Sequence, residues 1–311
     1  MTTALLLAGG FALLVVGSDI LVRCAVALAR RLSVSPLVIG LTVVGFGTSI
    51  PELVTSVEAA IRGSPGIAVG NIVGSNICNI LLILGLSALL CPLSVSRDTF
   101  ARDGGVMLLA AIAVVALVPL GSLARPVGLV FLALLAAYLA DAYRRGRVPA
   151  DAAAGDPAGP LQRLVLAVPA ALVGLGLTVL GAQFFVAGSI ELARLLQVSE
   201  SLIGLTVAAL GTSLPELATS VAAALRRQPD IALGNIVGSN IFNVFGILGV
   251  TALVRPVAIP DDIASFDVWV MLAASVLLVL ASVTGWRLTR SEGAGFLVAY
   301  AAYLAWLSAR G

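Results

Sequence analysis

Residues 45–85 read GFGTSIPELVTSVEAAIRGSPGIAVGNIVGSNICNILLILG, and residues 209–249 read ALGTSLPELATSVAAALRRQPDIALGNIVGSNIFNVFGILG, with a constant offset of 164. No gap interrupts this alignment, and 27 of its 41 positions are identical. Many of the identities fall on Gly, Pro, Ser, Thr, Asn and Glu. Core packing alone would repeat an apolar pattern without repeating polar residues. The two halves of the chain are therefore expected to perform the same polar task.

The composition is that of an integral membrane protein. Of 311 residues, 60% are hydrophobic and only 11% are charged, and the mean hydropathy is +1.11. A bilayer core of roughly 30 Å needs about 20 residues of helix. The apolar runs are continuous and lack the alternation of barrel strands, which indicates an all-α protein. They predict ten spans, near residues 3–29, 36–62, 67–90, 104–121, 124–143, 162–188, 200–225, 231–254, 266–285 and 293–309.

The ten spans divide into a first five-helix repeat (1–143), a linker (144–161) rich in Gly, Pro and Ala, and a second repeat (162–311). Five crossings are an odd number, so the second repeat must sit upside down relative to the first, as in secondary transporters. Thirteen of the 18 arginines lie on the linker side, and positive residues favour the cytoplasm. We therefore expect a multi-pass protein of the cell inner (plasma) membrane, with both termini outside and the linker cytoplasmic.

Several function classes are disfavoured by composition. The chain has no histidine, and its three cysteines show no metal-ligand spacing. An intramembrane hydrolase would need a nucleophile or a metal site, and no aspartates cluster to supply one. A net charge of +2 indicates no nucleic-acid partner. We expect no enzymatic activity and no resident cofactor, and membrane lipid is the expected surrounding.

Each repeat places one glutamate inside an apolar span. Glu52 lies well away from either end of the second span, and Glu216 repeats it in the seventh. An ionised carboxylate at that depth is costly unless something neutralises it. No arginine lies within either motif. The neutralising charge is therefore a proton or a bound cation.

Oxygen-bearing groups accompany each glutamate. Pro51 lacks an amide hydrogen, so the carbonyl of Gly47 loses its helical donor, and Pro215 repeats this effect. Carboxylate, hydroxyl and carbonyl oxygens suit calcium and sodium rather than zinc or copper. A spacing of four puts the following residues on one helix face in each repeat: Thr48, Glu52 and Ser56, and Thr212, Glu216 and Ser220.

A second polar motif, GNIVGSN, follows in the next span. Serine and asparagine spaced by four share a helix face, and glycines spaced by four allow another helix to approach closely. Close approach would bring the amide helix against the carboxylate helix, with the two glutamates facing each other near the membrane midplane. The residues concerned are Ser75, Asn79, Gly70 and Gly74, repeated as Ser239, Asn243, Gly234 and Gly238.

Ordinary structural roles compete with these interpretations. A glutamate in a span can be a protonated, hydrogen-bonded acid that joins helices, and a single GxxxG or Pro often reflects packing alone. Duplication of the whole polar context favours an ion site. Asp19 and Glu58 are not duplicated, since Gln183 and Ala222 stand in their places. We interpret Asp19 as a satisfied polar group or tilt anchor and place Glu58 outside the site.

The pair GTSIPE…GNIVGSNICN and GTSLPE…GNIVGSNIFN resembles the two alpha-repeats of the sodium/calcium exchanger family, of prokaryotic type, within the cation/calcium antiporter superfamily. The likeness covers the whole chain in span number and repeat order. It implies ten helices in two inverted five-helix repeats, with ion sites built from the second, third, seventh and eighth. It also implies alternating access in which the first and sixth helices slide against the rest.

The resemblance implies ligand roles for individual residues. The paired glutamates of the family fall on Glu52 and Glu216. Several members carry an aspartate where this chain has Asn243, and in the potassium-dependent branch that aspartate accompanies potassium transport. The amide therefore argues against potassium dependence. The other implied ligands are Thr48, Ser49, Thr212, Ser213, Ser75, Asn79, Ser239 and Asn243, with backbone ligands at Gly45 and Ala209.

Two carboxylates compensate one calcium ion, two sodium ions or two protons. An empty, doubly charged site is costly to carry through a dry intermediate, whereas a loaded one is not, so such a protein exchanges ions rather than leaks them. We predict sodium/calcium antiport that extrudes calcium, performed by a monomer. Calcium/proton antiport is the alternative. Magnesium exchange ranks third, because magnesium sheds water reluctantly, and a channel would not explain uncompensated charge sealed within an inverted repeat.

Overall fold

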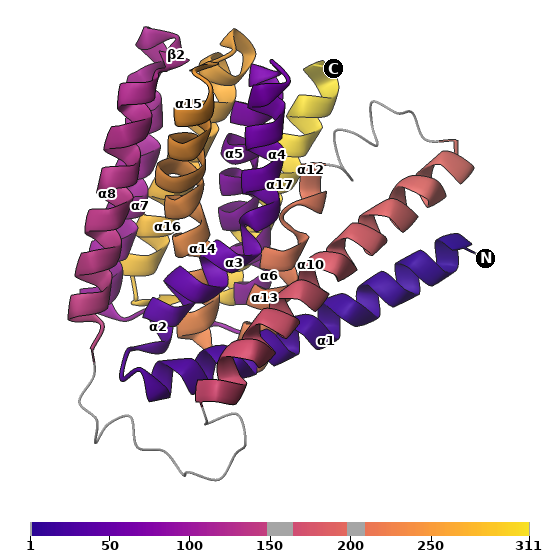
Figure 1. Ribbon diagram of the computed structural model, residues 1–311, viewed down its shortest axis with the longest axis vertical. Coiled ribbons are helices and arrows are strands. Elements are labelled where there is room, and N and C mark those ends of the chain that lie inside the picture. Colours follow the sequence, from indigo (N-terminus) through magenta and orange to yellow (C-terminus); the bar gives the residue numbers. More distant parts are fainter. Residues whose placement is uncertain (1, 148–163, 198–208, 311) are drawn as a thin grey trace.

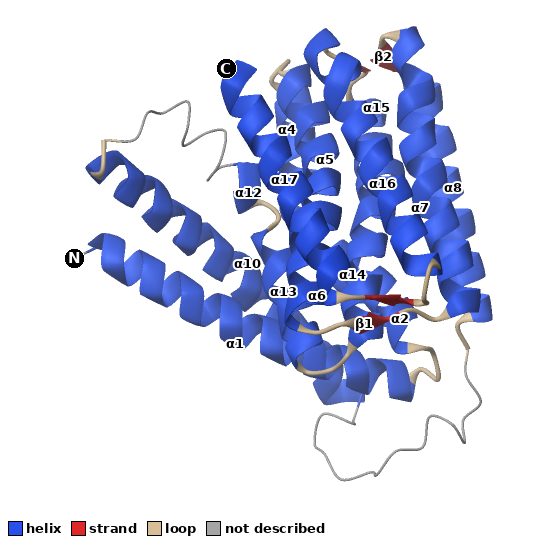
Figure 2. Cartoon of the chain, turned by 180° about the vertical axis from the view of Figure 1, so that it is seen from behind, coloured by secondary structure: helices blue, strands red, loops and turns tan. Residues whose placement is uncertain are grey.

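The computed structural model describes residues 2–147, 164–197 and 209–310, and these form an almost entirely helical bundle (Figures 1 and 2). The first half contains α1 (Thr2–Arg31), α2 (Pro36–Ile39), the π-helical η1 (Gly40–Val44), α3 (Gly45–Thr48), α4 (Ile50–Ile61), α5 (Pro65–Cys78), η2 (Asn79–Leu84), α6 (Gly85–Leu90), α7 (Arg97–Leu117), η3 (Val118–Leu120) and α8 (Arg125–Arg145). The second half contains α10 (Leu164–Leu195), α12 (Ala209–Gly211), α13 (Leu214–Leu225), α14 (Pro229–Ile241), η6 (Phe242–Leu248), α15 (Gly249–Val254), η7 (Ile263–Asp267), α16 (Val268–Val283) and α17 (Arg290–Arg310).

The predicted all-α membrane fold is confirmed. Seven helices of the described ranges are long and apolar enough to cross a membrane, and the bent segment from Pro36 to Ile61 makes an eighth. A helix lies at each predicted span, although the start of the one predicted at 200–225 falls outside the described residues. The linker at 144–161 also lies largely outside them. The division into ten spans therefore stays a prediction.

Two short antiparallel strand pairs join the halves at the ends of the bundle. Strand β1 (Leu93–Ser94) pairs with β4 (Arg287–Leu288), and β2 (Ser122–Leu123) pairs with β3 (Val257–Ala258). Each pair links the loop after a central helix to the loop between two peripheral helices of the other half. These pairs hold the two repeats in register with each other.

The centre of the bundle consists of α5 with η2 and α6, and of α14 with η6 and α15. Most of their side chains are buried, including Ile72, Ile77 and Ile236. The peripheral helices expose large apolar side chains instead, such as Leu172 and Val298. Apolar exposure of this kind is unfavourable in water and suits contact with lipid. The polar motifs therefore lie inside a sheath of helices that face the membrane.

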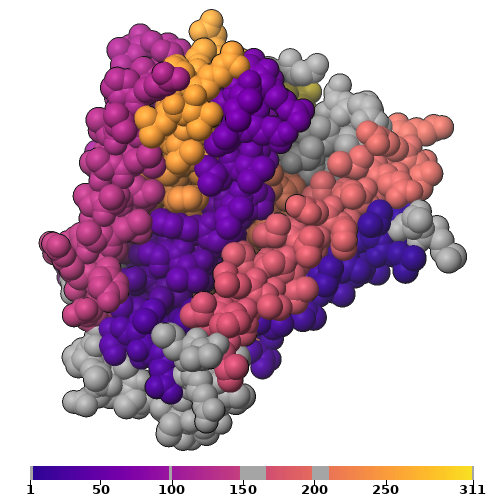
Figure 3. All heavy atoms as spheres, in the orientation of Figure 1, coloured from indigo at the N-terminus to yellow at the C-terminus, as the bar shows by residue number. Residues whose placement is uncertain are grey.

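Helices α1 and α10 pack side by side along most of their length and lean away from the remaining bundle (Figures 1 and 2). Figure 3 shows the salmon surface of α10 crossing in front of the other helices with indigo α1 beside it. Glycines make this contact close. A Cβ atom added to Gly17 would lie 2.6 Å from the Thr178 nitrogen, and one added to Gly181 would lie 2.6 Å from the Leu14 nitrogen. Side chains at these positions would separate the two helices.

The close approach predicted for GNIVGSN is confirmed in the second repeat. A Cβ atom on Gly234 would lie 2.7 Å from the Leu37 oxygen, and one on Gly238 would lie 2.3 Å from the Leu41 oxygen. The amide helix α14 thereby contacts the segment that leads into the glutamate helix of the other half. Gly74, which corresponds to Gly238, has no described atom within 4 Å of an added Cβ.

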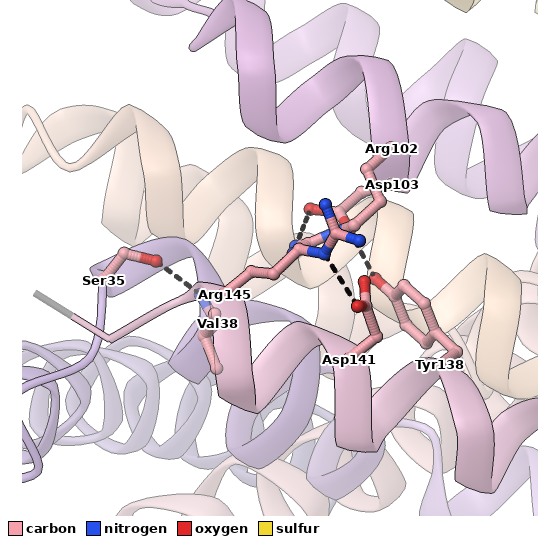
Figure 4. A network of polar contacts seen from close by, with 7 residues as sticks. All are labelled: Ser35, Val38, Arg102, Asp103, Tyr138, Asp141 and Arg145. Atoms are coloured by element: carbon pink, nitrogen blue, oxygen red, sulfur yellow. Dashed lines mark hydrogen bonds and ion pairs between the residues drawn. The ribbon is translucent and has the colours of Figure 1, made fainter.

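A buried polar network joins α7 to α8 at one end of the bundle (Figure 4). The Asp103 carboxylate, 1% exposed, accepts hydrogen bonds from Arg102 at 2.6 and 2.9 Å and from the Tyr138 hydroxyl at 3.1 Å. One turn further along α8, Arg145 donates to Asp141 at 2.7 Å. The charge of the Asp103 carboxylate is thus compensated by Arg102 on the same helix, and this network is separate from the two glutamates.

Candidate cation-binding site

The two glutamates lie in the first turns of α4 and α13 and are each 1% exposed. Within the described ranges, Oε2 of Glu52 and Oε2 of Glu216 have no hydrogen-bond partner. Among the described residues, no arginine forms an ion pair with either carboxylate. The charge of the two carboxylates is therefore left uncompensated by the arginines of the described residues.

Serines at two helix breaks each donate a hydrogen bond to the glutamate of the other repeat. Ser49 (φ −84°, ψ 9°) separates α3 from α4, and Ser213 (φ −88°, ψ 4°) precedes α13 in the same conformation. The first break bends the span by 45°. Ser49 Oγ donates to Glu216 Oε1 at 2.8 Å, and Ser213 Oγ donates to Glu52 Oε1 at 3.2 Å. The predicted facing of the two glutamates follows from this exchange of partners.

The break lies two residues before the proline in each repeat. A proline at helix position N1 or N2 needs no amide donor, so Pro51 and Pro215 start α4 and α13 without leaving an orphan group. The proline thus stops the preceding helix and begins the next one. The serine between the two helical segments is left with backbone geometry that turns its hydroxyl toward the other repeat.

Two asparagines that sequence reasoning left out of the site support the glutamate helices. Asn71 Nδ2 donates to the Glu52 carbonyl at 3.2 Å and to Ser56 Oγ at 2.9 Å. In the other repeat, Asn235 Nδ2 donates to the Glu216 carbonyl at 3.3 Å and to Ser220 Oγ at 2.8 Å. The signal for these residues was available, because both asparagines are identical in the two copies of GNIVGSN.

The amide oxygens of the same asparagines reach the threonines across the interface. Thr212 Oγ1 lies 3.3 Å from Asn71 Oδ1, and Thr48 Oγ1 lies 3.2 Å from Asn235 Oδ1. Each threonine is therefore held against the opposite repeat. Thr48 is fully buried, whereas Thr212 is partly exposed, which is the first difference between the two halves of the site.

The candidate ligands of the third and eighth predicted spans face the glutamate-bearing segments. Ser75 Oγ is 3.3 Å from Ser213 Oγ, and Ser239 Oγ donates to the Gly45 carbonyl at 3.1 Å. One turn further on, Asn79 begins the π-helical η2 and Asn243 lies in the π-helical η6. Both amides are 1% exposed, and both Oδ1 atoms lack a donor. Widened π-helical turns are rare and are frequent at functional sites.

The structure brings the predicted residues of both repeats into one interior region between α4, α5, α13 and α14. The backbone candidate Gly45 begins α3 and meets Ser239 there, while Ala209 begins the short α12. The described ranges contain no cluster of three or more His, Cys, Asp or Glu side chains. The charge of the site is therefore two carboxylates, and the remaining oxygens are neutral. Such a set suits hard cations.

Access to the site differs at its two ends. A cavity of about 500 Å³ between α4 and α10 is lined by Pro51, Gln183 and Thr212 and so reaches the site. The corresponding groove between α1 and α13 has a lining that includes Asp19 and Arg226 but none of the predicted ligands. At this end Asp19 contacts Arg226 and also pairs with Arg23 at 2.9 Å.

The two acidic residues placed outside the site are satisfied elsewhere. Asp19 has the arginine partners just described, which confirms its interpretation as a satisfied polar group. Glu58 pairs with Arg62 one turn along the exposed end of α4. Neither carboxylate takes part in the interior cluster.

Comparison with known proteins identifies relatives over nearly the whole chain. The family described as "Sodium/calcium exchanger protein" matches residues 2–143 and 166–309. The sodium/calcium exchanger MaX1 of Methanosarcina acetivorans is 36% identical over 96% of this chain and 97% of its own, and the inner membrane protein YrbG of Escherichia coli is 38% identical over 99% and 98%. The solved structure of the sodium-calcium exchanger NCX_Mj, soaked with Na⁺ and Ca²⁺, superposes with a TM-score of 0.85 at 34% identity over 98% of both chains.

Proposed function

The chain belongs to the sodium/calcium exchanger family, and we propose that it is a secondary active antiporter that exchanges sodium for calcium and extrudes calcium. The family is one of transporters. The protein is a membrane protein with several apolar spans, and a relative covering almost its full length is named an inner membrane protein. The proposal adds the identity of the ions, the direction of flux and the residues that bind them.

One observation carries the proposal. Four buried oxygens at the interface of the repeats receive no hydrogen bond from any described residue: Oε2 of Glu52, Oε2 of Glu216, Oδ1 of Asn79 and Oδ1 of Asn243. Unsatisfied buried acceptors are rare because each costs about 1–3 kcal/mol. Bound cations would supply the partners that these oxygens lack. Two carboxylates neutralise one divalent cation or two monovalent ones.

Exchange follows from this charge balance. Calcium and a pair of sodium ions would compete for the same carboxylates, so binding of one displaces the other. Without either, two ionised glutamates would face each other in a membrane interior, which is strongly unfavourable. Conversion between states that face opposite sides of the membrane is therefore favoured only for the loaded protein. The twelve residues implied by the family resemblance are proposed as ligands in this cycle.

The difference between the two ends of the site indicates which side is open. The cavity beside Thr212 reaches the site, whereas Asp19 and Arg226 hold α1 on α13 at the other end. The arginine distribution assigns Arg226 to the cytoplasmic side. On this orientation, with ten spans in two inverted repeats and both termini outside, the open cavity is extracellular. Glycines bring α1 and α10 into close backbone contact, which supports movement of the two helices as one unit.

Ion flux into liposomes tests the proposal. Purified protein is reconstituted into sodium-loaded vesicles, which are diluted into sodium-free medium containing ⁴⁵Ca²⁺. We expect calcium uptake that disappears when sodium is equal on both sides. Uptake driven by a pH gradient and not by sodium would instead establish calcium/proton antiport. No uptake under either gradient, in protein shown to be folded, would refute calcium exchange.

A further inference from the structure

Behind the candidate ligands lie two hydrogen-bonded pairs of buried asparagines, and each pair joins one residue of the first repeat to one of the second. Asn79 Nδ2 donates to Asn240 Oδ1 at 3.1 Å, and Asn243 Nδ2 donates to Asn76 Oδ1 at 2.9 Å. All four side chains are at most 4% exposed. The 164-residue offset relates the two bonds, because it converts Asn79 to Asn243 and Asn76 to Asn240. Each candidate ligand is thus held by an asparagine of the opposite repeat.

The outer end of each asparagine pair meets a methionine. Asn240 Nδ2 lies 3.7 Å from Met107 Sδ on α7, and Asn76 Nδ2 lies 3.6 Å from Met271 Sδ on α16. Asn76 Nδ2 also lies 3.4 Å from the Asn240 carbonyl oxygen. The two methionines are fully or almost fully buried and are themselves related by the 164-residue offset. The contact between an asparagine and a methionine therefore occurs once for each repeat.

The chemistry of the thioether determines which way the amides face. A thioether sulfur carries no hydrogen and can only accept a hydrogen bond. Asn240 therefore turns its NH₂ group toward Met107 and its oxygen toward Asn79. Asn79 must then present NH₂ to that oxygen, which leaves its own Oδ1 without a partner, as observed. Asn76 likewise turns its NH₂ group toward Met271 and its oxygen toward Asn243, and here the Asn240 carbonyl is a second acceptor for the same NH₂ group.

The free oxygens belong to the face that holds the other candidate ligands. Asn79 lies one turn beyond Ser75, whose hydroxyl is 3.3 Å from that of Ser213, and Ser213 binds Glu52. An asparagine side chain is nearly symmetric in shape, so packing alone does not select oxygen over nitrogen. For a cation the choice is decisive, because a reversed amide would present two positive hydrogens to it.

We propose that Met107 and Met271 are positioning residues, which act through Asn240 and Asn76 to point the amide oxygens of Asn79 and Asn243 at the transported cation. This inference rests on the proposed function, because it assumes that the ligand is a cation. The methionines and the two supporting asparagines contact the ligands and not the ion. Outer contacts of this kind change the affinity of metal sites by about 10- to 100-fold when removed.

Two substitutions at each methionine separate orientation from packing. Leucine keeps the apolar volume of methionine and removes the acceptor, whereas glutamine supplies a carbonyl acceptor one bond further from the backbone and is polar. We expect Met107→Leu to raise the KM for calcium about tenfold with an unchanged maximal exchange rate. Met271→Leu should raise it less, because Asn76 keeps the Asn240 carbonyl as an acceptor. Met107→Gln and Met271→Gln should restore a KM near that of the wild type. A packing role predicts the opposite order, with leucine tolerated and glutamine damaging.

Calcium-dependent thermal stabilisation of the purified variants provides a second readout that does not require transport. Met107→Leu should need about tenfold more calcium for the same shift in Tm, and Met271→Leu a smaller excess, while the Tm of both variants without calcium stays close to that of the wild type. If wild-type protein exchanges and binds calcium but the leucine variants match it, the orientation proposal is wrong and the proposed function stands. If wild-type protein neither binds nor exchanges calcium, the proposed function fails first.

Discussion

The centre of the molecule and its ends differ in how closely the two repeats match. At the centre, contacts of the first repeat recur in the second with the partners exchanged. Ser49 binds Glu216 and Ser213 binds Glu52, and the asparagine pairs behind them follow the same rule. A site that releases the same ions toward either side of a membrane benefits from two equivalent halves.

At the ends the equivalence is lost. Asp19 on α1 contacts Arg226 at the end of α13, whereas the corresponding positions are Gln183 on α10 and Arg62 at the end of α4. Arg62 pairs instead with Glu58 of its own helix. One end therefore carries an ion pair between helices, and the other carries an ion pair within a helix. The difference shows that both repeats contribute matching residues to the polar centre, whereas the ion pair between helices is present at one end of the described structure and not at the other.

Neutralising either glutamate would test the equivalence of the centre most severely. We expect Glu52→Gln and Glu216→Gln to reduce calcium exchange equally, because each removes one of the two charges that compensate the ion. Loss of one partner from a buried charge pair costs about 3–5 kcal/mol, which corresponds to roughly two to four orders of magnitude in affinity. Sodium-driven ⁴⁵Ca²⁺ uptake by reconstituted protein measures both variants. A difference of more than about tenfold between them would break the equivalence.

Removing the serine hydroxyls that cross between the repeats should have a smaller, equally matched effect. Ser49→Ala and Ser213→Ala each remove one hydrogen bond to a buried carboxylate, and such bonds contribute about 1.5–3 kcal/mol. We expect the KM for calcium to rise at least about tenfold in each variant. Ser265→Ala, at an exposed hydroxyl on η7 that bonds only locally, is the matched control. Equal effects at the two serines with none at the control would sharpen the comparison.

Sequence reasoning identified the centre because the repeat marks it. Residues such as Glu52 and Asn79 stand out as polar identities in apolar helices, and helical spacing assigns them to a face. Spacing does not say which helix of the other repeat lies opposite that face. The cross-repeat roles of Asn71 and Asn235, and the asparagines bonded to methionine, therefore became visible only with the helices in place, even though the repeat contains them.

The positions of the helices were predicted from the sequence, but their bends and their contacts with one another were not. Apolar length predicts that helices cross the membrane, and all the described spans are helical. The bend at Ser49, the π-helical turns at Asn79 and Asn243, and the joining of α1 to α10 depend on contacts between distant segments. Asp19 shows the same limit, because its partner Arg226 is 207 residues away. Its interpretation as a satisfied group was correct, but its role in holding α1 on α13 required the structure.

The ends of the site should respond more weakly than its centre. Asp19→Asn removes the α1–α13 ion pair, whose side chains are about one-third exposed. A partly exposed pair contributes about 1 kcal/mol at most, which corresponds to about fivefold in a two-state equilibrium. We expect the balance to shift by up to this factor toward the state open at the α13 end. Glu58→Gln, which removes an exposed pair within one helix, should leave the balance unchanged.

Site accessibility gives the measurement for this variant. A single cysteine placed at Ala218, in the groove between α1 and α13, is introduced into a background in which Cys24, Cys78 and Cys91 are replaced by alanine. Labelling of this cysteine by a membrane-impermeant thiol reagent should become faster in the Asp19→Asn background and should not change with Glu58→Gln. Equal labelling rates in all three backgrounds would show that the ion pair does not hold this end closed.

The reverse substitution asks whether the missing pair can be built at the other end. Gln183→Asp places a carboxylate on α10 at the position equivalent to Asp19. This position lines the open cavity between α10 and α4, and Arg62 lies at the end of α4. If charge between helices sets the resting state, the new aspartate should attract Arg62 when α10 approaches α4 and should favour closure of that end, by no more than about fivefold. Labelling of a cysteine at Thr55, in the cavity between α4 and α10, should then slow, while labelling at Ala218 accelerates. Because the two changes must have opposite signs, a uniform loss of protein stability cannot imitate them.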